Sequence, residues 1–204
     1  MTEPPPAEGL ILASASPHRR RLLQAAGLAF DVVPAGIDEA ALKRALAAEG
    51  ADALKVAGRL AGAKAQAVST EHRDAVVIGA DQVLDCEGQW FDKPGNLGNA
   101  RAQLLRLRGR AHHLHSGVAL ARRGAIVWQS ADTAALVMRQ FSDAFLDRYL
   151  AEAGGAIWGT VGAYEIEGIG IQLFAAVHGD CSTIIGLPML PLLAELRARG
   201  WLAT

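Results

Sequence analysis

LILASASPHRRRLLQAAG, residues 10–27, predicts a strand, a tight loop and a helix in direct succession. Residues 10–13 form an apolar run with the length of a buried strand. Ser16 suits a helix N-cap, and Pro17 suits the first helical position, where a missing N–H costs nothing. Gly27 suits the end of the helix. The stretch therefore predicts a β–α unit, and the rest of the chain is interpreted around it.

The first turn of this predicted helix carries His18, Arg19, Arg20 and Arg21. Cations are unfavourable there because the helix dipole is positive at its N-terminus. A bound anion removes the conflict, since backbone N–H groups, serine hydroxyls and guanidinium groups all donate to phosphate. The alternative is that the arginines form a solvated surface. We favour a phosphate site that includes the hydroxyls of Ser14 and Ser16.

Length and composition fit one compact domain. The chain has 204 residues, 51% of them hydrophobic, and its 20 basic residues nearly balance 21 acidic ones. With this charge balance we expect no extended positive electrostatic potential that would attract nucleic acid or an anionic membrane, so we expect neither as a partner. Residues 1–9 lack the features of a signal peptide and are expected to be a flexible leader, with a single domain over residues 10–204.

Two cysteines, Cys86 and Cys181, lack the spacing of a disulfide framework or a thiolate zinc site. They are typical of a reducing compartment, and a cytoplasmic location is the expectation. No apolar run approaches the length of a membrane span. The sequence therefore indicates a cytoplasmic protein.

Strand and helix patterns alternate along the remaining chain, which predicts the α/β class. We expect strands at residues 28–35, 75–80, 113–121, 125–138 and 168–178. We expect helices at residues 40–69 with a break near Gly50, at 99–107, at 143–151 capped by Ser142, and at 188–200.

Polar side chains gather at the predicted ends of these elements. Asp81 follows the buried strand 75–80, and the exit of a parallel strand is where ligands bind in open α/β sheets. Glu39 follows the second strand, and Lys93 precedes Pro94, which favours an extended backbone. Lys64 lies at the edge of an apolar helical stripe, where a lysine usually keeps its ammonium in water.

Two carboxylates with several cations suit metal-assisted hydrolysis of a phosphoanhydride. The candidate residues are Ser14, Ser16, Arg19, Glu39, Lys64, Asp81 and Lys93. Mg²⁺ or Mn²⁺ takes oxygen ligands from carboxylates and phosphates together and activates a bound water. Lysine and arginine neutralise charge on the leaving group. Asp81 can be a general base or a metal ligand, and the sequence leaves both roles open.

Common signatures of other chemistries are missing. The chain has neither the P-loop pattern nor the dinucleotide-binding glycine pattern. His112, His113 and His115 resemble a metal tract, but no carboxylate or thiol nearby completes a ligand set. We therefore expect these histidines to have a surface or hairpin role.

Separated motifs resemble, in order, the Maf family of nucleoside triphosphate pyrophosphatases. They lie at residues 12–20 with 22–23, 37–39, 60–61 with 64–65, 79–83, 93–94, 162–164 with 167–168, and 185–188. The resemblance implies an elongated mixed sheet flanked by helices with a central cleft, as in inosine-triphosphatase-like proteins. It also implies a homodimer that uses a divalent metal to cleave a nucleoside triphosphate into the monophosphate and pyrophosphate.

The resemblance also assigns roles to individual residues. Asp81 matches the family's proton acceptor, and Glu39 matches its metal-associated acid. Phosphate-binding positions of the family fall on Ser14, Arg19, Lys64 and Lys93.

Three positions bear on the nucleobase: His18, Gln82 and Glu167. Members selective for dTTP and UTP carry arginine, threonine and glutamine there, whereas members selective for 7-methyl-GTP carry tryptophan, glutamine and glutamate. Two of three positions match the second type, and a carboxylate accepts both N–H groups on the guanine edge. His18 departs from the pattern, since it stacks on a base with less area than tryptophan.

We therefore favour a purine of the 7-methyl-GTP kind and the disposal of modified nucleotides as the function. Three alternatives remain open from the sequence. The first is a dTTP/UTP pyrophosphatase, the second a nucleotide-binding regulator of cell division with little turnover, and the third an interaction module that shares only the fold.

Overall fold

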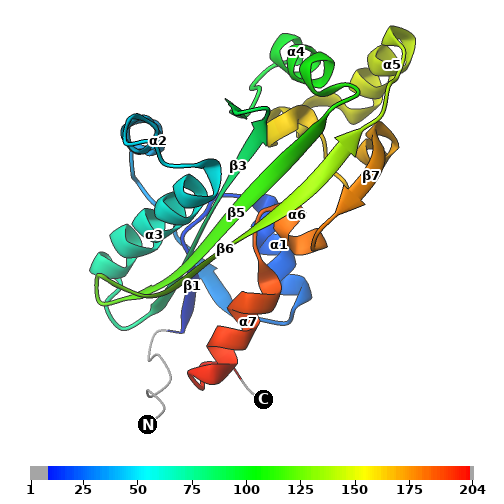
Figure 1. The fold of residues 1–204 in the computed structure, drawn as a ribbon. Helices are drawn as coiled ribbons and strands as arrows, with labels where there is room; N and C mark the ends of the chain where they lie inside the picture. The colour runs from blue at the N-terminus through cyan, green and yellow to red at the C-terminus, as the bar shows by residue number, and fades with distance from the viewer. Residues whose placement is uncertain (1–8, 203–204) are drawn as a thin grey trace. The chain divides into compact units, whose positions relative to one another are not determined.

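The computed structural model describes residues 9–202, and all but Gly9 of the predicted leader lies outside this range (Figure 1). The strands are β1 (Leu10–Leu12), β2 (Phe30–Val32), β3 (Val76–Cys86), β4 (Gln89–Phe91), β5 (Ala111–Arg122), β6 (Ala125–Met138) and β7 (Phe174–His178). The α-helices are α1 (Pro17–Ala25), α2 (Glu39–Ala48), α3 (Ala53–Glu71), α4 (Leu97–Leu107), α5 (Asp143–Ala153), α6 (Cys181–Ile185) and α7 (Met189–Ala198). The described part of the chain also contains the 3-10 helices η1 (Gly154–Gly159), η2 (Val161–Ala163) and η3 (Ile169–Leu173).

The strands form one mixed sheet. Its order is β2-β1-β3-β5-β6-β7, and β4 pairs with β3 off this path. β1 is parallel to both β2 and β3, whereas β4 is antiparallel to β3 and β7 is antiparallel to β6. The predicted α/β class with a mixed sheet and flanking helices is confirmed. No helix within residues 9–202 has both the length and the apolar character needed to cross a bilayer.

The described residues form two compact units. Unit 1 contains the chain up to Gln82, Ser116–Asp132, and the chain from Gly186 onwards. Unit 2 contains Val83–His115 and Thr133–Ile185. Each unit has its own hydrophobic core.

In unit 1, β1 and the parts of β3 and β5 in this unit bury both faces, with the alternation that a pleated strand imposes. One face carries Leu12, Ile78 and Leu120, which pack with side chains of α1 and α7. The opposite face carries small side chains such as Ala13 and Ala119, which pack with α3. Figure 1 shows α2 alongside α3, and the two helices are in contact. The buried strands predicted at residues 10–13 and 75–80 are therefore covered on both sides.

Two glycines let α3 approach this second face closely. A Cβ added to Gly79 of β3 would lie 2.6 Å from the backbone nitrogen of Ala65 and would also strike the carbonyl oxygen of Ala61. A Cβ on Gly117 of β5 would lie 2.6 Å from the backbone nitrogen of Gly58. Only glycine fits at such distances, so the helix backbone rests directly on the strands.

The core of unit 2 lies around α4, α5 and the segments of β5 and β6 in this unit. His112 is fully buried in it, and its Nε2 lies 2.8 Å from the hydroxyl of Tyr164. Burial lowers the pKa of His112 to about 4. The surface role expected for His112 is therefore wrong. His113 and His115 stack with ring centroids 5.9 Å apart, and no group of three potential ligands able to hold a metal occurs in the described chain.

The local signals at helix ends are confirmed. The Oγ of Ser16 accepts from the backbone N–H of Arg19, and Pro17 opens α1. Ser142 caps α5 in the same way, with 3.2 Å between its Oγ and the nitrogen of Phe145. Gly50 separates α2 from α3, as expected.

Two strand predictions are wrong in extent. The strand expected at residues 28–35 is only Phe30–Val32, because its partner β1 offers three residues for pairing. In the stretch 168–178 only the second half is a strand, and the first half is the 3-10 helix η3. Gly170 lies so close to Glu165 that a Cβ would meet its backbone, so the glycines there serve a tight turn rather than a strand.

Candidate functional site

Asp81 lies inside β3, not after it. The strand predicted to end at Ala80 continues to Cys86. The parallel pairing with β1, however, has its last register pair at Leu12 and Ile78, followed by one hydrogen bond from Ala13 N–H to the Ile78 carbonyl. Asp81 therefore lies just past the carboxyl end of β1, which is where side chains can reach a ligand in an open α/β sheet.

A buried lysine joins Asp81 to Glu39. The Nζ of Lys64 lies 2.6 Å from Oδ1 of Asp81 and 2.8 Å from Oε2 of Glu39. The Lys64 side chain is 8% exposed and that of Asp81 13%, whereas the Glu39 side chain is 51% exposed. A lysine at the edge of a helical stripe usually extends its ammonium into water. That of Lys64 is instead held between two carboxylates.

Strand parity explains this contact. Asp81 has the same parity as Gly79, so its side chain points to the α3 face of β3. Lys64 precedes Ala65, the residue that rests on Gly79. The close approach of α3 thus carries the lysine to the aspartate, and Glu39 reaches the same ammonium from the first turn of α2.

Arg19 has its guanidinium fixed by oxygen atoms. Nε donates to the carbonyl of Gly186 at 2.8 Å, and Nη1 donates to the carbonyl of Ala80 at 2.8 Å and to Oγ of Ser14 at 3.1 Å. Burial lowers the pKa of Arg19, while the charges of Asp81 and Glu39 act in the opposite direction. Within residues 9–202, Nη2 makes no hydrogen bond, so one amino group of the fork is left to donate to a ligand.

The loop before α1 is organised by its serines. Oγ of Ser14 accepts from the backbone N–H of Ser16 at 3.2 Å, and Oγ of Ser16 accepts from the N–H of Arg19 at 3.4 Å. Both oxygens act here as acceptors, so each hydroxyl hydrogen is available to donate. Arg20 is exposed, and Arg21 contacts Nδ1 of His18 at 2.6 Å. Only Arg19 of the three arginines therefore joins the groups around β3.

The side chain of Gln82 points to the opposite face of β3 from that of Asp81. Its Nε2 donates to Oγ of the buried Ser116 at 2.9 Å, and a Cβ on Gly186 would lie 3.6 Å from its carboxamide carbon. Sequence reasoning did not single out Gly186 or Ser116 as part of the site. The signal for Gly186 was its place in the motif at residues 185–188, and Ser116 carried none.

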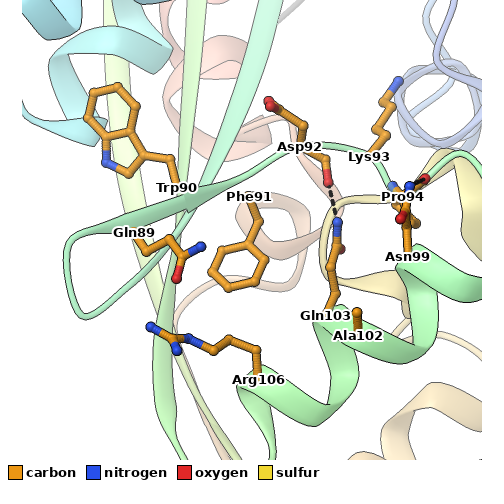
Figure 2. Close-up of a pocket in the computed structure, with 10 residues that line it drawn as sticks. All are labelled: Gln89, Trp90, Phe91, Asp92, Lys93, Pro94, Asn99, Ala102, Gln103 and Arg106. Atoms are coloured by element: carbon orange, nitrogen blue, oxygen red, sulfur yellow. Dashed lines mark hydrogen bonds between the residues drawn. The ribbon is translucent and has the colours of Figure 1, made fainter.

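Lys93 and Glu167 belong to unit 2. Lys93 is exposed at the edge of a pocket of about 460 Å³ lined by β4 and α4 residues, including Phe91, Gln103 and Arg106. Figure 2 shows the Lys93 side chain pointing away from Phe91 and Gln103. Glu167 is exposed in the turn between η2 and η3. Their part in one site with Asp81 stays a prediction.

The donor set in unit 1 fits a hard divalent cation. Asp81 and Glu39 present carboxylate oxygens that already meet at one positively charged nitrogen. Mg²⁺ is usually bound by one or two carboxylates, and its remaining ligands are waters and substrate phosphates. Lys64, Arg19 and the serine hydroxyls carry donor groups of the kind that bind phosphate oxygens. The arrangement is thus suited to binding a polyphosphate together with a cation.

Comparison with known families identifies the chain. The profile of the family described as "Maf-like protein" matches residues 9–199. The chain belongs to the Maf family.

Maf relatives match this chain over nearly its whole length. A protein of Granulibacter bethesdensis named "Nucleoside triphosphate pyrophosphatase" is 51% identical over 92% of this chain and 95% of its own. One of Rhizobium meliloti named "7-methyl-GTP pyrophosphatase" is 49% identical over 94% of this chain and 96% of its own. A second 7-methyl-GTP pyrophosphatase, of Mesorhizobium japonicum, is 46% identical over 95% and 97%.

Proposed function

We propose that this Maf protein hydrolyses a nucleoside triphosphate to the monophosphate and pyrophosphate. The observation that carries the proposal is the cluster in which Lys64 holds Asp81 and Glu39 beside the arginine and serines at the start of α1. Relatives at about half identity named as nucleoside triphosphate pyrophosphatases support the same reaction.

In the proposed reaction, water adds to the α-phosphorus and the bond to the bridging oxygen of pyrophosphate breaks. Asp81 accepts the proton of that water, or binds the cation that activates it. A Mg²⁺ or Mn²⁺ ion, held by Glu39 and Asp81, would lower the pKa of water and neutralise phosphate charge. Pyrophosphate then leaves carrying charge that cationic side chains stabilise.

The binding groups of the proposal are Ser14, Ser16, Arg19, Lys64 and Lys93. Arg19 is held in place by two carbonyls and Ser14, so its free amino group is presented in a fixed direction. A preorganised donor of this kind loses little entropy when the phosphate arrives. The hydroxyls of Ser14, which contacts the same guanidinium, and of Ser16 are two further donors in this proposal.

For the base we propose a purine of the 7-methyl-GTP kind, which would be recognised by contacts with His18, Gln82 and Glu167. Two relatives that carry this substrate in their names support it. A glutamate accepts from guanine and complements a methylated, cationic ring. The competing substrates are dTTP and UTP, which a glutamine in place of Glu167 would suit better.

The proposal includes a homodimer in the cytoplasm with neither nucleic acid nor membrane as partner. The near balance of 20 basic and 21 acidic residues supports the absence of a polyanionic partner. Light scattering coupled to size exclusion tests the dimer.

The deciding experiment measures pyrophosphate release from a panel of triphosphates that contains 7-methyl-GTP, GTP, UTP and dTTP, with Mg²⁺ or Mn²⁺. We expect 7-methyl-GTP to have the largest kcat/KM, and Asp81→Asn to lower kcat by about 100- to 10,000-fold while substrate still binds. Asp31→Asn, an exposed aspartate of β2, is the matched control and should keep full activity. Absence of pyrophosphate from every triphosphate would contradict the proposed function.

A further inference from the structure

Lys64 occupies the position between two carboxylates that a bridging cation would take. Its Nζ is within hydrogen-bond distance of Asp81 Oδ1 and Glu39 Oε2, at 2.6 and 2.8 Å. These are its only partners within residues 9–202. Asp81 is anchored on a buried strand, whereas the half-exposed Glu39 begins a helix.

A divalent cation cannot share both oxygen atoms with this ammonium. Like charges a few ångströms apart repel strongly in a partly buried site, where the effective dielectric constant is low. The cation cannot simply displace the ammonium either, because the buried lysine would then be a charge without a counter-ion, which is costly. Lys64 therefore has to gain another anion before the carboxylates can take a cation.

A polyphosphate is such an anion. It offers oxygens to Lys64, and it also completes the ligand shell of a cation for which two carboxylates are too few. The free Nη2 of Arg19 and the serine hydroxyls provide the rest of its binding site.

We propose that Lys64 is an exchangeable counter-ion that couples cation binding to polyphosphate binding. In the resting protein Lys64 neutralises Asp81 and Glu39 and keeps their affinity for divalent cations low. When a polyphosphate binds, the ammonium transfers to it, and both carboxylates become available to the cation. This inference rests on the proposed function for its substrate class, and it adds the order in which the charges exchange.

The first test measures Mn²⁺ binding to the nucleotide-free protein by electron paramagnetic resonance of free Mn²⁺. We expect Lys64→Met to bind Mn²⁺ about tenfold more tightly than the wild type, or better, because the repelling charge is gone. Lys55→Met is the matched control: it removes the same charge from an exposed lysine of the same helix, and should leave the affinity unchanged. Adding Glu39→Gln to Lys64→Met should abolish the gain. Equal affinity in Lys64→Met and the wild type would overturn the proposal.

The second test uses the wild-type chain, so it holds even where Lys64→Met does not fold. A buried, hydrogen-bonded lysine ammonium can be followed by ¹⁵N NMR of Nζ. We expect the Lys64 signal to keep its position with MgCl₂ alone and to move when inorganic tripolyphosphate is added. Movement with Mg²⁺ alone, or none with tripolyphosphate, would refute the exchange.

These outcomes separate the inference from the proposed function. Pyrophosphate release from a triphosphate without a gain of Mn²⁺ affinity in Lys64→Met overturns the counter-ion exchange alone. A gain of affinity in a protein that releases no pyrophosphate overturns the proposed function and leaves the exchange standing.

Discussion

Replacing Gly79 with alanine should separate Lys64 from Asp81 without changing either residue. The added Cβ would lie 2.6 Å from the nitrogen of Ala65 and would also strike the Ala61 carbonyl oxygen. Carbon atoms normally stay about 3.5 Å or more from such neighbours, so α3 must move off the sheet by about 1 Å. Both obstructing groups are helix backbone, and no side-chain rotation can relieve the clash.

The expected cost follows from this geometry. Overpacking a core costs about 1–3 kcal/mol, and a clash between two backbones belongs at the upper end of that range. For a chain of this size, about 3 kcal/mol lowers the melting temperature by roughly 6–12 °C. The 2.6 Å pair between Lys64 and Asp81 lies on the same face, and misplacement by 1 Å can cost about 100-fold in rate. We therefore expect kcat to fall well beyond what the lost stability explains.

Gly58→Ala is the control, because it makes the same chemical change in α3, the helix that packs on Gly79. Its Cβ would lie 4.0 Å from the Cβ of Ala131, which is ordinary contact. Alanine is favoured over glycine inside a helix by about 0.5–1 kcal/mol, so this variant should be slightly more stable. Calorimetry and pyrophosphate release on both variants test the reasoning. If Gly79→Ala melts and turns over like the wild type, the close approach of α3 does not position Lys64.

Three further predictions concern other parts of the chain. The folded-state pKa of His112, about 4, lies below its ordinary value of 6.5, so the folded state binds fewer protons between these values. Stability should be fully present above pH 6.5 and fall by about 3 kcal/mol as the pH drops to 4, and urea unfolding of the wild type and His112→Gln measures this. Lys93→Met should lower kcat/KM for the triphosphate by about 10- to 100-fold through the loss of a charged hydrogen bond to phosphate, as steady-state kinetics would show. Ser142→Ala should lower the free energy of unfolding by about 1 kcal/mol, measured by denaturant titration, because α5 loses its N-cap.

Local signals made the elements of this fold predictable. Ser16, Pro17 and Ser142 are found at the helix starts where capping preferences placed them. The apolar run at residues 75–80 is a strand buried on both faces. Such features depend on a few neighbouring residues, so the sequence contains them directly.

Other features depended on distant partners. The length of β2 is set by the three residues of β1, and the burial of His112 depends on Tyr164, 52 residues away. Lys64 is the clearest case. Its helix stripe predicted a solvated ammonium, but its position between two carboxylates is set by Gly79 beneath α3 and by Glu39 from another helix. No local pattern contains that information.

The neighbours Asp81 and Gln82 show how one strand can serve two purposes. Because side chains alternate along β3, the aspartate faces α3 and its lysine, while the glutamine faces Ser116 and the loop of Gly186. The carbonyl of the residue before them, Ala80, holds Arg19. Asp81, which would activate water in the proposed enzyme, and Gln82, which would contact the base, therefore lie on opposite faces of one buried strand, and Arg19 is bonded to the backbone of the same strand. A change in the register of β3 by one residue would exchange the two faces. The packing of α3 on Gly79 holds this register, so it matters as much to the chemistry as the charged residues do.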